Sequence, residues 1–137
     1  KWVENLTRCA YSKRNIGTVT PFSNNAGAFS APFINLRNNI PTWSTKDELA
    51  RAISSTSKYI YPKVPTGNGF CMYIKRKLIN QIGVFDQVSF PRGYGEENDF
   101  CMRALTRGWK NVIDDSTYIY HKRAQSFKKE KRILIAD

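Results

Sequence analysis

Helical and strand patterns alternate along this chain, and the alternation limits the folds it can adopt. The opening segment, WVENLTRCAYS, places Trp2, Leu6, Cys9 and Ala10 on one side of a short amphipathic helix. The next segment, IGTVTPF, is typical of a strand. A helix followed directly by a strand predicts an alternating α/β fold.

The remainder of the chain continues this pattern. The stretch SNNAGAFSAPFINLRNN is rich in Asn, Gly, Ser and Pro and predicts a loop, whereas residues 44–48 carry a capping pattern before a helical run. Further on, VPTGNG predicts a turn, FCMYIKR a half-buried strand, and KLINQIG a short helix ended by Gly83. The segment WKNVIDDSTYIYHKR predicts one or two strands around Val112 and residues 118–120.

The composition is typical of a globular protein. With 137 residues, 41% of them hydrophobic and 13% aromatic, the chain can supply the core of one domain or of part of one. It contains neither a run of about 18 apolar residues nor an export-signal pattern, so we expect a cytoplasmic location. Cys9, Cys71 and Cys101 lie far apart in apolar contexts, which favours buried thiols over disulfides or metal ligands.

The chain is strongly basic. Its net charge is +11 and its pI is near 9.8, which suggests a polyanionic partner: nucleic acid, a nucleotide-phosphate ligand or an anionic membrane. The terminal stretch HKRAQSFKKEKR is either a solvated tail or a segment that contacts a membrane or a phosphate. Its cations are Lys122, Arg123, Lys128, Lys129, Lys131 and Arg132.

The stretch PRGYGEENDFCMR gathers acids at the expected start of a helix. Glu96, Glu97 and Asp99 follow a turn in which Gly93 and Gly95 free the backbone for a close approach. The helix dipole stabilises each ionised carboxylate by about 0.3–1 kcal/mol. Such carboxylates suit proton transfer or the binding of sugar hydroxyls, and simple helix capping is the alternative interpretation.

Four segments in this order carry a resemblance to a known family: TVTPFSNNAGAFS, PTGNGFCMYIKRKLINQIGVFD, FPRGYGEENDFCMRALTRGW and TYIYHKRAQSF. Together they resemble the second half of a bacterial family-2 glycosyltransferase with the GT-A fold, of the kind that builds O-antigen, capsule and other surface polysaccharides. The resemblance implies a nucleotide-sugar donor, a glycan or polyprenol-linked acceptor, a divalent metal (Mn²⁺ or Mg²⁺), and transfer with inversion at the anomeric carbon.

The resemblance also implies a missing part. Such enzymes begin with a nucleotide-binding half that ends in an Asp-x-Asp motif, and no Asp-x-Asp occurs in this sequence. The resemblance therefore implies that residues 1–137 are the C-terminal portion of a single GT-A domain, folded as a mixed sheet flanked by helices. It also implies that the metal is held mainly by a motif outside them. We expect this portion to be inactive by itself and to have exposed apolar surface or to self-associate. Asp114 and Asp115 are adjacent and are expected to be structural rather than metal ligands.

Family resemblance assigns roles to the acids. Glu97 matches the catalytic base and Glu96 the acid that contacts the sugar, although many relatives have Asp where this chain has Glu97. That departure leaves Asp99 as an alternative base. On a helix, Asp99 shares a face with Glu96 while Glu97 points about 100° away, so the three acids cannot all face one acceptor.

Other candidates line the expected cleft. Gly67-Asn68-Gly69 forms a floor under the donor sugar or a plain turn. Asn24 and Asn25 follow a strand end, where the ligand sites of open α/β sheets gather, and an ordinary Asn-rich turn is the alternative.

Family relatives also use a late histidine on the metal or diphosphate, which points to His121, with Lys122 or Arg123 as alternatives for the diphosphate. A structural role is the other interpretation of a lone histidine after a strand. Trp43, Tyr94 and Trp109 have rings that can stack on sugars, although Trp109 also suits the core.

The alternative function is a non-catalytic module that binds carbohydrate or nucleic acid. Nucleic acid is disfavoured because no recognition motif is present and the clustered acids oppose phosphate.

Overall fold

The computed structural model describes residues 1–92 and 95–122. Its elements are α1 (Trp2–Tyr11), β1 (Ile16–Ser23), the 3₁₀ turn η1 (Gly27–Phe29), α2 (Lys46–Thr56), β2 (Lys63–Val64), β3 (Tyr73–Ile74), α3 (Arg76–Ile82), α4 (Glu96–Thr106) and β4 (Lys110–Ile119). The sequence expectations for Gly93, Tyr94 and the basic stretch from Arg123 onward lie outside the described residues.

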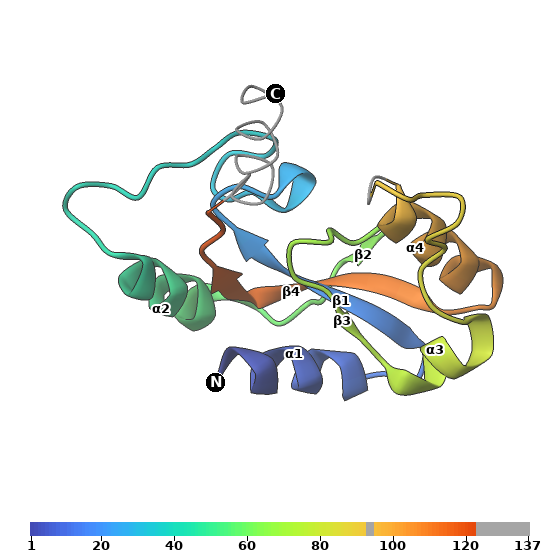
Figure 1. The fold of residues 1–137 in the computed structure, drawn as a ribbon. Coiled ribbons are helices and arrows are strands. Elements are labelled where there is room, and N and C mark those ends of the chain that lie inside the picture. The colour runs from blue at the N-terminus through green and yellow to red at the C-terminus, as the bar shows by residue number, and fades with distance from the viewer. Residues whose placement is uncertain (93–94, 123–137) are drawn as a thin grey trace, which may run out of the picture.

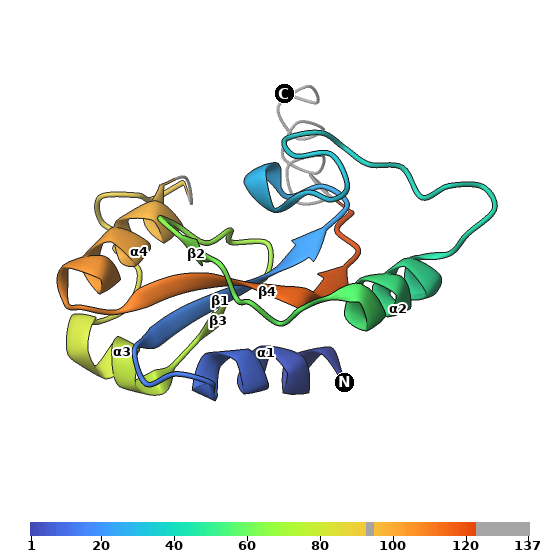
Figure 2. The same ribbon diagram turned by 180° about the vertical axis from the view of Figure 1, so that it is seen from behind.

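A four-stranded mixed sheet forms the centre of the molecule, with strand order β2-β4-β1-β3. The two long strands, β1 and β4, run parallel, and the short strands β2 and β3 pair antiparallel to them. Helices flank the sheet, with α1 along one side and α4 on the other (Figures 1 and 2). The predicted mixed sheet flanked by helices is confirmed.

The two faces of the sheet are packed differently. On one face, Val19 and Val112 pack with Leu6, Cys9 and Ala10 of α1 in an apolar cluster. On the other face the contacts are polar: Thr18 donates to Asn111 Oδ1, and Asn111 Nδ2 donates to the Cys101 carbonyl of α4 and to the Pro65 carbonyl. A second apolar cluster, made by Leu78, Phe100, Ala104 and Trp109, joins α3 and α4 at one end of the sheet.

Local signals predict the helices well. Thr45 caps α2 by accepting a hydrogen bond from the Glu48 amide, and Gly83, with φ of 81°, ends α3. In α1 the predicted Leu6, Cys9 and Ala10 are buried, but Trp2 is 51% exposed because it lies in the first turn, one turn beyond the buried residues.

The strand predictions need more correction. The segment FCMYIKR forms a strand only at Tyr73–Ile74, because the Asn68 side chain and carbonyl hold the amides of Phe70 and Cys71 in a turn and Lys75 caps α3. The final segment forms one strand, β4, with an irregularity in register opposite Pro21 and Phe22.

Asp114 and Asp115 are structural, as expected. The buried Asp114 carboxylate at the β4 irregularity accepts hydrogen bonds from the Ser116 amide and hydroxyl and from the Thr117 hydroxyl. The Asp115 carboxylate accepts from the amides of Ile60 and Tyr61, which fixes the segment between α2 and β2. Both carboxylates are thereby engaged by the protein itself.

The cysteines are free thiols, with Cys9 and Cys101 buried and Cys71 half-buried. Burial raises the pKa of all three, so they remain protonated at neutral pH. Among the described residues, no helix combines the length and apolar character needed to span a membrane.

Candidate functional site

The carboxyl ends of β1 and β4 bring two predicted site segments together. Because the strands are parallel and Ser23 is paired with Ile119, the residues that follow each strand emerge at one edge of the sheet. There the Asn24 side chain bridges to His121: its Oδ1 accepts from the His121 amide at 2.6 Å, and its Nδ2 donates to the His121 carbonyl at 3.3 Å. Asn24 is buried and fastens the two strand ends to each other.

The His121 ring is oriented by contacts on two sides. Its Nδ1 lies 2.8 Å from the Asn25 carbonyl oxygen, and a carbonyl can only accept, so Nδ1 carries the proton. The Phe70 ring lies against the imidazole with ring centroids 5.1 Å apart. In the neutral ring this tautomer leaves the lone pair on Nε2, the arrangement found in histidines that bind a metal.

The loop of residues 67–69 is fixed against β1. The Asn68 amide donates to Thr20 Oγ1, its side-chain Nδ2 donates to the Ala26 carbonyl, and its Oδ1 accepts from the Phe70 amide. The side-chain amide is thus used within the protein, and of the two glycines of the loop only Gly69 is exposed. Gly67 is buried, and its amide donates to Cys101 Sγ of α4 at 3.3 Å.

Glu97 lies against this loop. A Cβ built on Gly69 would stand 3.6 Å from Glu97 Cδ and 3.7 and 3.8 Å from its two carboxylate oxygens. The N-terminus of α4 positions the carboxylate, and Gly95, whose φ is 91°, permits the turn into that helix. The structure therefore brings Glu97 and Gly69 together, with Phe70 leading from this loop to His121.

Glu96 and Asp99 have different environments. The Glu96 Oε2 atom is buried without a hydrogen-bond partner among the described residues. Asp99 instead forms an ion pair with Arg103 of the same helix, with 2.9 Å between Oδ2 and Nε. None of the three acids caps the helix, because its N-cap is Gly95 and no side-chain capping bond is made there.

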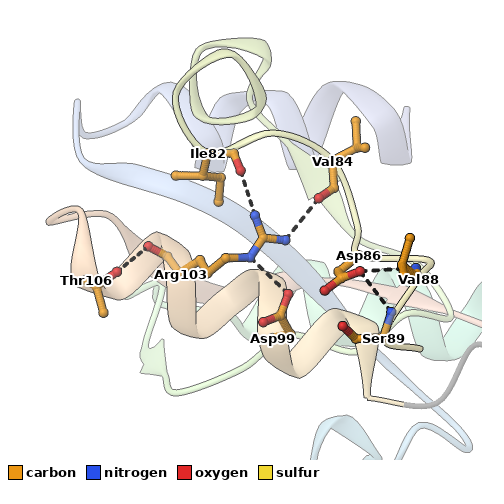
Figure 3. Close-up of polar contacts among 8 residues, drawn as sticks. All are labelled: Ile82, Val84, Asp86, Val88, Ser89, Asp99, Arg103 and Thr106. Carbon is orange, nitrogen blue, oxygen red and sulfur yellow. Dashed lines mark hydrogen bonds and ion pairs between the residues drawn. The ribbon is translucent and has the colours of Figure 1, made fainter.

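Arg103 ties Asp99 to the preceding segment (Figure 3). Its guanidinium donates to the carbonyls of Ile82 and Val84 as well as to Asp99. Nearby, the Asp86 carboxylate accepts from the amides of Val88 and Ser89, and these bonds, led by Ser89, lower its pKa. Asp99 thus belongs to the contacts that hold the segment after α3, whereas Glu97 faces the loop at Gly69.

The other predicted ring and metal candidates fall at different places. Trp43 is 81% exposed, and Trp109 is a core residue whose Nε1 donates to Gln81. Within residues 1–92 and 95–122, no three His, Cys, Asp or Glu side chains are grouped to hold a metal ion. His121 can offer one ligand, so a metal there needs ligands from elsewhere.

The sequence did not indicate that Thr20, Ala26 and Phe70 support the site through their contacts with Asn68 and His121. Thr18 and Thr20 alternate with the apolar Val19, and that alternation indicates a polar face on β1. Nothing local indicates that Phe70 stacks on His121.

No family model matches the chain, and neither a curated protein nor a solved structure shows significant similarity to it.

Proposed function

We propose that this chain is the acceptor-side part of an inverting, nucleotide-sugar-dependent glycosyltransferase. The reaction transfers a sugar to a glycan or polyprenol-linked acceptor in surface polysaccharide synthesis, on the cytoplasmic side of the cell membrane. The observation that carries the proposal is the placement of the Glu97 carboxylate against Gly69, beside the strand ends that hold Asn24, Asn25 and His121. The order of the four resembling segments supports it.

In this proposal Glu97 is the general base. Inverting transfer requires a carboxylate to take the proton of the acceptor hydroxyl as its oxygen attacks the anomeric carbon and the bond to the diphosphate breaks. Glu97 is half-buried and makes no hydrogen bond or ion pair within the described residues, so it is available to an acceptor. Asp99 is already paired with Arg103, which favours Glu97 over Asp99 for this role.

Glu96 contacts the sugar or the acceptor in this proposal. A buried carboxylate oxygen without a partner is costly, and a hydroxyl group of a bound sugar would donate the missing hydrogen bond. Gly69 lines the donor side, where the absence of a side chain allows a sugar to approach the backbone. The predicted contact at Gly67 is wrong, because Gly67 is buried against Thr20 and Met72.

His121 is the metal or diphosphate contact. Its Nε2 lone pair suits Mn²⁺, and the other metal ligands would come from an Asp-x-Asp motif outside this chain. A divalent metal bound there would neutralise charge on the diphosphate leaving group.

A donor screen on the full-length protein tests the proposal. Several UDP-, GDP- and dTDP-sugars are incubated with Mn²⁺ or Mg²⁺ and a membrane-lipid extract, and release of the nucleoside diphosphate is measured. We expect metal-dependent release with one donor class, and loss of release in Glu97→Gln. Sugar binding without turnover of any donor would instead favour a carbohydrate-binding module.

A further inference from the structure

A hollow of about 250 Å³ lies at the amino ends of β1 and β4, at the opposite edge of the sheet from Asn24 and His121. Three elements line it: the turn that leads into β1, helix α3, and the turn that leads into β4. Figures 1 and 2 show these elements together at one end of the sheet. The main lining residues are Arg14, Asn15, Lys77, Gln81, Arg107 and Trp109.

The hollow carries unbalanced positive charge. Arg14, Lys77 and Arg107 line it, and among the described lining residues none is acidic. None of these three cations forms an ion pair within the part of the chain that the structure describes. Three like charges without a counter-ion repel one another, so an anion bound between them would relieve that repulsion.

A fourth cation stands behind the hollow. Lys75 is 5% exposed, and its ammonium group donates to the carbonyls of Lys13 and Arg14 and lies over the Trp109 ring. Burial and the neighbouring Lys77 lower the pKa of Lys75. These two hydrogen bonds hold the backbone that carries Arg14 against Lys75.

The neutral groups of the hollow also suit an anion. Trp109 Nε1 donates to Gln81 Oε1 at 2.8 Å, which leaves the Gln81 amide nitrogen as a donor. Guanidinium groups bind phosphate oxygens through two parallel hydrogen bonds. The volume lies below the about 300–1,000 Å³ of pockets for drug-sized ligands, and so fits a small group.

We propose that this hollow binds a phosphate group, carried either by a small soluble anion such as a diphosphate or by an anionic lipid headgroup. The site is separate from the one that holds Glu97 and His121. Phosphate binding at this hollow does not require the protein to be a glycosyltransferase, because it depends only on Arg14, Lys77 and Arg107 and their surroundings.

The test compares two charge-matched double variants of the full-length protein at constant ionic strength. The hollow variant, Arg14→Gln with Arg107→Gln, removes both guanidinium groups that line the hollow. The control variant, Arg37→Gln with Arg51→Gln, removes the same charge from exposed positions elsewhere. In the described structure none of these four side chains makes a hydrogen bond or ion pair, so both variants should fold. Pyrophosphate is titrated while the indole N–H signal of Trp109 is followed by NMR.

We expect the Trp109 signal to shift, and the affinity for pyrophosphate to fall about tenfold or more in the hollow variant but less than about twofold in the control. Sedimentation with phosphatidylglycerol and phosphatidylcholine vesicles identifies the source. Binding to phosphatidylglycerol that the hollow variant loses indicates a lipid headgroup, and pyrophosphate binding alone indicates a soluble anion. An unmoved Trp109 signal, or equal weakening in both variants, overturns the proposal.

Discussion

Asp99 and Glu97 lie two positions apart in α4, yet their carboxylates have different surroundings. The Asp99 side chain is 30% exposed and pairs with Arg103, which also binds the carbonyls of Ile82 and Val84. Glu97 meets the Gly69 loop instead. At the residue scale, then, Asp99 is paired within the fold, whereas Glu97 makes no hydrogen bond or ion pair among the described residues.

Asp99→Asn should lower stability. Asparagine keeps the shape but removes the charge from the pair with Arg103, and we expect a loss of about 0.3–0.5 kcal/mol in the free energy of unfolding. Urea denaturation measures it. The matched control is Asp47→Asn, because Asp47 is also an acid in a first helical turn but has no ion pair among the described residues. Equal losses in the two variants would show that the ion pair contributes nothing.

At the scale of the element, the loop between β2 and β3 contains two glycines with different constraints. A Cβ on Gly67 would lie 2.7 Å from Thr20 Oγ1 and 2.8 Å from Met72 Cε, whereas a Cβ on Gly69 would meet nothing closer than 3.6 Å. We expect Gly67→Ala to cost about 1–3 kcal/mol of stability through overpacking, and Gly69→Ala to cost less than about 0.5 kcal/mol.

The Gly69 variant also tests the role of the loop. Its new methyl group would stand beside the Glu97 carboxylate and narrow the space for substrate, so turnover in the full-length protein should fall while stability holds. Thermal unfolding and nucleoside diphosphate release measure the two effects. Unchanged turnover in Gly69→Ala would remove the loop from the floor of the site.

Tyr61, between α2 and β2, should make the free energy of unfolding decrease at alkaline pH. Burial, with a smaller contribution from the nearby Cys9 and Asp114, raises its pKa from 10.0 to about 12. A raised pKa means that the fold favours the neutral phenol. Its contribution is therefore complete below about pH 10 and is lost as pH rises towards about 12.

Phenylalanine cannot ionise, so Tyr61→Phe should reduce the fall in the free energy of unfolding at alkaline pH. Its backbone bond to Asp115 is kept, so the variant should resemble the parent protein near neutral pH. Free energies of unfolding at about pH 8 and about pH 12 give the comparison. A difference between variant and parent that stays constant across this range contradicts the assignment.

The sequence predicts helices better than strands here because helical signals are local. Thr45 and Gly83 mark the start of α2 and the end of α3 within a few residues of each helix. By contrast, β2 has only two residues and exists through pairing with Asn111 and Val112, which are distant in the chain. Such pairing leaves no local pattern to find.

Some contacts of the candidate site can also be predicted from the sequence, and one cannot. The meeting of Asn24 with His121 follows from two parallel strands that end at one edge, which strand patterns and topology rules anticipate. The Asp99–Arg103 pair follows from i,i+4 spacing. The contact of Glu97 with Gly69 depends on how α4 packs across the sheet, and no periodicity in the sequence predicts that.

At the scale of the whole molecule, large apolar side chains remain exposed. Phe33, Ile34 and Leu36 are 65%, 64% and 59% exposed, in the segment between η1 and α2. Exposed apolar surface of this kind favours association. We expect the mass of the 137-residue chain by light scattering to rise with concentration. Replacing Phe33 and Ile34 with serine should reduce the rise, and a constant monomer mass in the unmodified chain would contradict the expectation.

The central claim is that Glu97 accepts the proton of the acceptor, and turnover of Glu97→Gln in the full-length protein tests it most directly. Glutamine keeps the shape and hydrogen bonding of the side chain but not its proton acceptance. We expect turnover to fall by about 10²–10⁴ with little change in donor affinity, and Asp99→Asn to lose much less. A deeper loss in Asp99→Asn would move the base to Asp99, and near-normal turnover in both variants would contradict a catalytic role for this acidic cluster.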